Sequence, residues 1–143
     1  MSVKRVPPSE AKRLLDAGWR YVDVRSIPEF EAGHPDGAYN VPLMHFLPGR
    51  GMSPNPDFLD VLVRRFAKDD KLIMGCKTGG RSLRAAELLA AQGFSSVVDM
   101  QGGYEGEKDA LGRTLVPGWK DSGLPVASAA AGRTYEELAK PSE

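Results

Sequence analysis

Short apolar runs alternate with amphipathic stretches along this chain of 143 residues. The apolar runs predict buried strands at 21–24, 72–75 and 95–100, with a weaker strand fragment at 38–40. The amphipathic stretches predict helices at 10–17 after an N-cap at Ser9, in one turn within 27–33, at 56–66 after an N-cap at Asn55, at 81–92 before Gly93, and within 101–112. Because helices alternate with strands, we expect an α/β domain with a mostly parallel central sheet.

Three segments lack such a pattern. Turn residues dominate 47–55, which we expect to be a loop, and 112–126, which we expect to be irregular. The segment 127–143 consists mainly of small and polar residues that have little to bury. We therefore expect one domain at 1–126, followed by a C-terminal tail at 127–143 whose packing the sequence leaves open.

The charge and composition exclude several classes of partner. The 19 basic and 19 acidic residues give a formal net charge of zero, so we expect neither a nucleic acid nor a membrane surface as partner. No apolar run approaches the roughly 20 residues of a membrane span, and no apolar segment follows the basic N-terminus, which argues against a secretory signal. One Cys and two His are too few for a dedicated zinc site, and a single Cys suits a reducing compartment. We expect a cytoplasmic protein without metal or cofactor.

The only cysteine, Cys76, stands in the segment MGCKTGGRS, between the predicted strand at 72–75 and the predicted helix at 81–92. Backbone amides and the start of a helix favour negative charge in such a loop. The same field favours the thiolate over the thiol, and the thiolate is the reactive form of cysteine. We therefore interpret Cys76 as a candidate nucleophile.

The residues that follow the cysteine suit the binding of an anionic substrate. The two glycines allow backbone conformations that a Cβ would resist, and the two cations add positive charge. The two hydroxyl groups can donate to a sulfur atom, although the serine could equally cap the following helix. These candidate substrate-binding residues are Lys77, Thr78, Gly79, Gly80, Arg81 and Ser82.

A simpler interpretation stays open. A lone cysteine is often a small buried hydrophobic residue, and a glycine pair can be a tight turn. That interpretation explains the glycines but not the clustered cations. The sequence shows no pairing of Cys76 with a histidine, and we expect His34 and His45 to be polar surface residues in loops.

Three stretches match one family in the right order. They are YVDVRSIPEFEAGHPDGAYNVPL, GCKTGGRS and VVDMQGGYEG, which together extend over about residues 9–106. By these motifs the chain resembles a single-domain rhodanese, a thiosulfate sulfurtransferase. The resemblance implies a rhodanese-like fold, with a central parallel sheet of about five strands and helices on both faces.

The resemblance also implies an enzyme that transfers sulfur in two steps. The Cys76 thiolate attacks the sulfane sulfur of a small anionic donor such as thiosulfate, sulfite leaves, and Cys76 carries a persulfide. Cyanide or a thiol, which could belong to a protein, then takes that sulfur. Lys77 and Arg81 attract the dianionic donor, and the loop amides stabilise the anions.

Two alternatives share the same fold. The loop from Cys76 to Arg81 spans six residues, whereas the related tyrosine phosphatases have one residue more in this loop to hold a phosphate. We therefore expect sulfur transfer rather than a phosphatase or an arsenate reductase. A module that carries sulfur or binds a protein partner stays open, because an intact Cys76 does not distinguish it from a free-standing enzyme.

Residues outside the loop match the family as well. Asp23 and Arg25 lie at the carboxyl end of the first predicted strand, the edge at which parallel sheets place their sites. They resemble a supporting pair, with a routine salt bridge as an equal alternative, and we expect Arg25 to pair with Glu29 or a nearby carbonyl. Gly102 and Gly103 are expected to form a turn packed beside the site.

Overall fold

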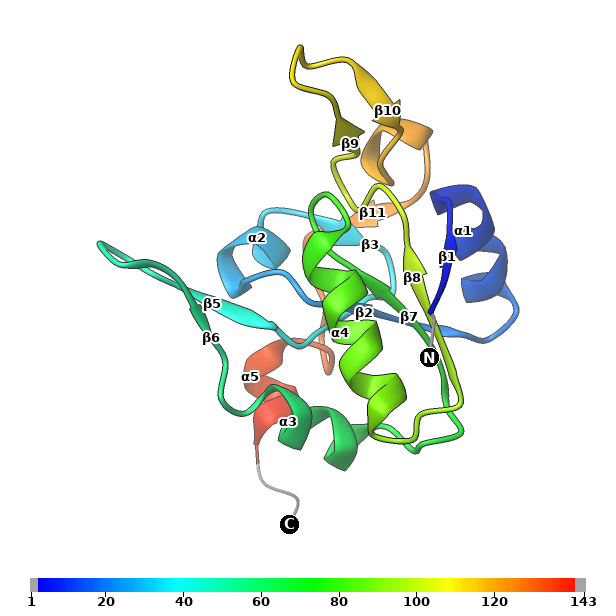
Figure 1. Ribbon diagram of the computed structural model, residues 1–143. Helices are drawn as coiled ribbons and strands as arrows, with labels where there is room; N and C mark the ends of the chain where they lie inside the picture. The colour runs from blue at the N-terminus through cyan, green and yellow to red at the C-terminus, as the bar shows by residue number, and fades with distance from the viewer. Residues whose placement is uncertain (1–2, 141–143) are drawn as a thin grey trace.

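The computed structural model describes residues 3–140 and contains a five-stranded sheet at its centre (Figure 1). The strand order is β1-β8-β7-β2-β4, and all the pairings are parallel. The strands of this sheet are β1 (Lys4–Val6), β2 (Arg20–Asp23), β4 (Tyr39–Asn40), β7 (Lys71–Gly75) and β8 (Ser96–Met100). The expected α/β class is confirmed, and β1 is a strand that the apolar pattern does not predict.

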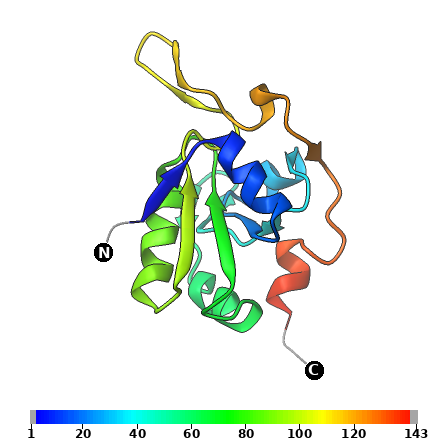
Figure 2. The same cartoon turned by 90° about the vertical axis from the view of Figure 1, so that its right-hand side faces the viewer.

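Helices cover both faces of the sheet (Figure 2). They are α1 (Pro8–Asp16), α2 (Ile27–Glu31), α3 (Phe58–Arg65), α4 (Gly80–Ala91) and α5 (Tyr135–Ala139), with a short 3-10 helix at Lys120–Ser122. Successive side chains of a strand point to opposite faces, so Tyr21 packs in the core under α1 and α2, whereas Val22 packs in the core under α3 and α4. Among residues 3–140, no helix is both long and apolar enough to cross a lipid bilayer.

A hairpin at 44–54 overlaps the segment at 47–55 that the sequence predicts as a loop. Its strands, β5 (Met44–Leu47) and β6 (Gly51–Pro54), pair antiparallel, and the hairpin projects from the body of the molecule (Figure 1). The turn between them contains Gly49 with φ +80°. The loop prediction is wrong here because the strands are short and the turn residues around them hide their alternation.

The prediction of a helix within 101–112 is also wrong. The chain turns after β8 and then forms β9 (Glu107–Lys108), which pairs antiparallel with β10 (Thr114–Val116). The turn contains three glycines with φ between +66° and +92°, at Gly102, Gly103 and Gly106. These backbone conformations lie outside the helical region, so the glycines outweigh the helix-forming residues near them.

Residues 127–140 pack against the rest of the protein, although their composition predicts little to bury. β11 (Val126–Ala127) pairs antiparallel with β3 (His34–Pro35), and α5 lies beside α3 (Figure 1). Leu138 is only 5% exposed, and the Arg65 guanidinium on α3 donates to its carbonyl oxygen at 2.7 Å. This part of the predicted tail is therefore integrated into the fold, and the end of that tail lies outside the described residues.

Candidate active site

The Cys loop (residues 76–81) leads from the end of β7 into the first residues of α4, at the carboxyl edge of the parallel sheet. Gly79 is the N-cap of α4 and has φ +115°, a conformation that favours glycine. In this conformation the backbone N–H of Gly79 donates to Cys76 Sγ at 3.1 Å. The cysteine, the glycine turn and the helix N-terminus that the sequence predicts to lie together are therefore together.

The Cys76 side chain is covered by its surroundings and is only 1% exposed. This differs from the sequence prediction, which requires a thiol that a donor can reach. The hydrogen bond from Gly79 nevertheless distinguishes Cys76 from a cysteine that only fills space, because its sulfur accepts an amide of the loop. An amide that donates to sulfur stabilises a negative charge on it.

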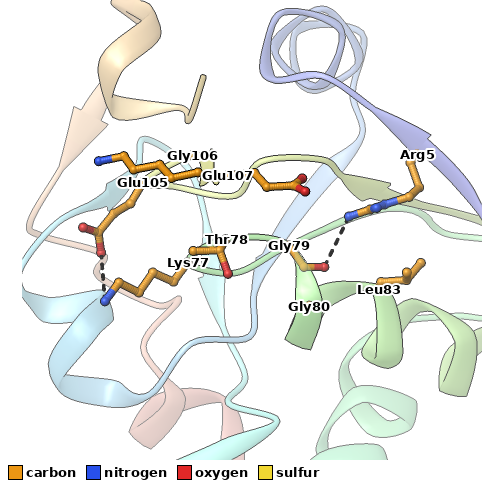
Figure 3. A pocket seen from close by; sticks show the side chains of 10 residues that line it. Arg5, Lys77, Thr78, Gly79, Gly80, Leu83, Glu105, Gly106 and Glu107 are labelled. Carbon is orange, nitrogen blue, oxygen red and sulfur yellow. Dashed lines mark hydrogen bonds and ion pairs between the residues drawn. The ribbon is translucent and has the colours of Figure 1, made fainter. Parts of the chain in front are cut away.

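Three cavities border the Cys loop, one of about 450 Å³ at Gly80 and Arg81 and two larger ones that both include Lys77. The first of the larger two, of about 660 Å³, opens over the start of α4 and is shown in Figure 3, and the loop residues that border it are Lys77, Thr78, Gly79 and Gly80. The second, of about 570 Å³, is bordered by Lys77 and Arg81 of the loop, by α2 and by the β5–β6 hairpin. Five of the six predicted substrate-binding residues therefore border one or both of the larger cavities.

The glycine turn that follows β8 packs directly against the backbone of the Cys loop, as the sequence predicts. The Tyr104 amide donates to the carbonyl oxygen of Cys76 at 2.7 Å. The Glu105 amide donates to the next carbonyl oxygen, that of Lys77, at 2.9 Å. A Cβ at Gly103 would lie 2.5 Å from the backbone of Lys77, so the close approach requires glycine at this position.

Arg81 is held by a carboxylate rather than left free for an anion. Its two terminal nitrogens donate to the two oxygens of Glu29 on α2, at 2.8 and 3.0 Å. Burial alone would raise the pKa of Glu29, but the hydrogen bonds from Arg81 and Ser26 outweigh it and lower this pKa to about 2. The pKa of Arg81 is raised, chiefly by the hydrogen bonds to Glu29, with a smaller contribution from the charge of a Cys76 thiolate. The pair therefore stays charged at neutral pH.

Lys77 also has an acidic neighbour. Its Nζ lies 3.8 Å from a carboxylate oxygen of Glu105, and Lys120 lies 3.6 Å from the other oxygen of Glu105. Figure 3 marks the ion pair between Lys77 and Glu105. Lys77 is about half exposed, with 51% of its side-chain surface open. It is therefore the loop cation that is more available to an anionic ligand.

Ser82 points into the protein and borders none of these three cavities. Its side chain is fully buried, and its hydroxyl donates to the carboxylate of Asp99 on β8. The other Asp99 oxygen accepts from Arg5 Nε at 2.8 Å, and Arg5 also donates to the Gly79 carbonyl oxygen at 3.5 Å. Burial raises the pKa of Asp99, although the bonds from Ser82 and Arg5 act in the opposite direction. This group braces α4 against the sheet. Sequence reasoning misses Arg5 because no local motif marks it, and it assigns no role to Asp99 although this residue lies in the matching stretch VVDMQGGYEG.

Asp23 and Arg25 form a buried ion pair at the end of β2, with 2.7 Å between Arg25 Nη2 and an Asp23 oxygen. Arg25 also donates to the carbonyl oxygen of Gly33 at 2.7 Å, and its guanidinium lies 4.4 Å from the centre of the Tyr104 ring. The predicted pairing of Arg25 with Glu29 is therefore wrong, and the predicted alternative, a nearby carbonyl, is correct. Through Tyr104 the pair supports the turn that holds the Cys loop.

The prediction that His34 is a surface residue is wrong. Its side chain is fully buried, its Nδ1 lies 2.8 Å from the Phe30 carbonyl oxygen, and its ring stacks on Phe30 with 3.7 Å between the ring centres. A second backbone oxygen, that of Ala129, lies 3.3 Å from Nε2. His34 therefore joins α2 to the C-terminal segment and takes no part in the site.

Comparisons of this chain with known proteins agree on one family. The family model described as Rhodanese-like domain matches residues 7–110. The protein named "Thiosulfate sulfurtransferase 16, chloroplastic", from Arabidopsis thaliana, is 43% identical over 126 residues, which cover 85% of this chain and 94% of that protein. Senescence-associated protein DIN1 from Raphanus sativus is 42% identical over 121 residues, which cover 85% of this chain but 59% of the length of DIN1.

A solved structure agrees with the sequence comparisons. The crystal structure of Rv0390 from M. tuberculosis superimposes with a TM-score of 0.75 at 28% identity, over 90% of this chain and 100% of the other. Sequence comparison and structure comparison therefore both find relatives of this chain. The chain belongs to the rhodanese-like domain family.

Proposed function

We propose that this protein is a sulfurtransferase that moves a sulfane sulfur through a persulfide on Cys76. The observation that carries the proposal is the hydrogen bond from the Gly79 amide to Cys76 Sγ at the start of α4. Such an amide stabilises the thiolate and then the persulfide, because both carry a negative charge. Membership of the rhodanese-like family and the Arabidopsis relative named thiosulfate sulfurtransferase support the same activity.

The first step loads sulfur onto the enzyme. The Cys76 thiolate attacks the outer sulfur of thiosulfate, the S–S bond of the donor breaks, and sulfite leaves with the bonding electron pair. In the second step cyanide or a thiolate, which could belong to a protein, attacks the outer sulfur of the persulfide. The product is thiocyanate or a new persulfide, and the Cys76 thiolate is restored. No external oxidant is needed, because the transferred sulfur keeps its oxidation state.

The donor must reach a sulfur that is covered in the structure. We expect entry from the cavity of about 570 Å³. The loop contributes two long side chains to its border, Lys77 and Arg81. Glu29 holds Arg81, but Lys77 is half exposed, and its long side chain can swing aside. The cavity of about 660 Å³ shares Lys77 and adds Thr78, but its other two loop residues, Gly79 and Gly80, offer only backbone, which hydrogen bonds hold in place.

Mass measurement tests the proposal. After incubation with thiosulfate, the intact protein should gain the mass of one sulfur atom, and peptide mapping should locate this atom on Cys76. Cyanide should remove it. A protein that gains no sulfur from thiosulfate or from a persulfide, but releases phosphate from an aryl phosphate, would be a phosphatase instead.

The choice of acceptor separates a free-standing enzyme from a sulfur carrier. Turnover with cyanide and with small thiols supports the enzyme. Turnover that requires a protein thiol favours the carrier. A cytoplasmic location stays a prediction, and the Arabidopsis relative is named as chloroplastic.

A further inference from the structure

The cavity of about 570 Å³ beside the Cys loop has two walls of different chemistry. One wall is polar and comes from α2 and the loop. The other wall is apolar and comes mainly from the β5–β6 hairpin. The residues that border the cavity are Ser26, Pro28, Glu29, Met44, Phe46, Met52, Lys77 and Arg81.

Much of the positive charge of the polar wall is neutralised by a neighbouring carboxylate. Both terminal nitrogens of Arg81 are engaged by Glu29, which also accepts from the backbone and hydroxyl of Ser26 at 3.1 and 2.8 Å. These bonds hold the pKa of Glu29 near 2, so its negative charge persists at neutral pH. Lys77, the other cation of this cavity, lies 3.8 Å from a second carboxylate, that of Glu105. A dianion such as thiosulfate that binds Arg81 must displace Glu29 or approach its carboxylate, and both are unfavourable.

The apolar wall is made of large side chains exposed on one face of the hairpin. Phe46 lies directly opposite Met52 in the hairpin register, and Met44 is two residues before Phe46, so the three share a face. Phe46 is 47% exposed and Met52 is 40% exposed. Leu47 is also exposed, at 39%, but it belongs to the opposite face and does not border the cavity. Exposed apolar side chains at a cavity favour an apolar ligand group.

We infer that this cavity selects sulfane sulfur donors that carry an apolar organic substituent and a single negative charge, and that Glu29 disfavours dianionic donors. The inference rests on the proposed sulfur transfer by Cys76 and specifies its donor. Organic thiosulfonates, R–SO₂–S⁻, have this chemistry. The Cys76 thiolate attacks their terminal sulfur, the S–S bond breaks, and the sulfinate R–SO₂⁻ leaves with the electron pair, which gives the same persulfide.

The test compares benzenethiosulfonate with thiosulfate as donors. The second-order rate constant for loading sulfur onto Cys76 is measured by quenching and intact mass, so that the acceptor does not enter. The two donors differ in intrinsic reactivity, and the ratio of their rate constants is therefore compared between variants. Thermal midpoints establish that each variant is folded.

Two variants should lower the preference for the organic donor in different ways. Glu29→Gln keeps an oxygen that can accept the Ser26 bonds but removes the charge, and should raise the thiosulfate rate constant about tenfold. Phe46→Ala removes the exposed ring and should lower the benzenethiosulfonate rate constant about tenfold, with thiosulfate little changed. Leu47→Ala, on the other face of the same hairpin, is the matched control and should leave the ratio unchanged.

The possible outcomes distinguish a failure of the donor assignment from a failure of the proposed sulfur transfer. A ratio that changes by less than about twofold in either Glu29→Gln or Phe46→Ala, while Cys76 still takes up sulfur, overturns the donor assignment and leaves sulfur transfer intact. An equal change in Leu47→Ala also overturns it, because the effect would not belong to the cavity face. If neither donor loads Cys76 in the unmodified protein, the proposed sulfur transfer itself is overturned.

Discussion

The Cys loop and the β5–β6 hairpin border the same cavity, but they are held in place in different ways. Backbone hydrogen bonds fix the Cys loop from the side, through the amides of Tyr104 and Glu105, and Gly79 closes it on the sulfur. The hairpin projects from the body (Figure 1) and presents large exposed side chains. Rigid backbone suits a group that must react at a fixed position, and exposed side chains suit recognition. We therefore expect substitutions in or against the Cys loop to alter the free energy of unfolding and the rate of sulfur loading. Substitutions in the hairpin should alter the choice of ligand.

The largest effect is expected for Cys76→Ser. Serine is close in size and can still accept the Gly79 amide, so the free energy of unfolding should change by about 1 kcal/mol or less. Sulfur loading should fall about a thousandfold or more, because a hydroxyl is a poor nucleophile without a base. Mass measurement after thiosulfate treatment checks this, and full loading in the variant would remove Cys76 from the mechanism.

Gly103→Ala should break the support of the loop. The new Cβ would lie 2.5 Å from the Lys77 backbone at a φ of +66°, so both a clash and backbone strain arise. We expect a loss of about 2–4 kcal/mol in the free energy of unfolding and about tenfold slower sulfur loading.

Gly112→Ala is the matched control for that substitution. Gly112 has a φ of +80°, and a Cβ there would meet nothing within 4 Å. The Gly112→Ala substitution introduces the backbone strain without the clash. It should lower the free energy of unfolding by about 1 kcal/mol and leave the rate of sulfur loading unchanged. Urea unfolding measures both variants. Equal losses would show that the contact with the Cys loop does not matter.

The Glu29–Arg81 pair should make stability depend on pH. The pKa of Glu29 falls from an ordinary value of 4.5 to about 2 on folding. A lowered carboxyl pKa contributes stability that is present above pH 4.5 and is lost as the pH falls toward 2. Since the carboxylate is partly open to solvent, we expect about 1–2 kcal/mol. The unmodified protein should therefore exceed Glu29→Gln in stability at neutral pH, and the two should converge near pH 2. Parallel curves in urea unfolding would contradict this prediction.

The smallest effect on stability is expected in the hairpin. Phe46 is 47% exposed, so Phe46→Ser should change the free energy of unfolding by about 0.5 kcal/mol or less. Phe58 is a matched aromatic residue in the core, at 3% exposure, and Phe58→Ala should cost about 3–5 kcal/mol. A large loss in Phe46→Ser would mean that the hairpin is a structural element rather than a recognition surface.

Much of the framework could be predicted because its signals are local. The apolar runs at 72–75 and 95–100 lie within β7 and close to β8, and the helix at 81–92 corresponds to α4. The position of Cys76 between strand and helix follows from those two elements. The hairpin escaped prediction because its strands are short, and the buried position of His34 escaped because its partners include residues from the distant C-terminal segment.

By itself the sequence determined the α/β class, the place of the cysteine and the glycine turns around it, since each depends on the pattern of neighbouring residues. Only the tertiary structure decided the environment of that cysteine. It paired Arg81 with Glu29 across 52 positions of the chain and tied Ser82 to Asp99. It also closed the protein over the sulfur. Charge and burial are set by which elements meet in space, and a linear pattern does not encode which carboxylate reaches which cation.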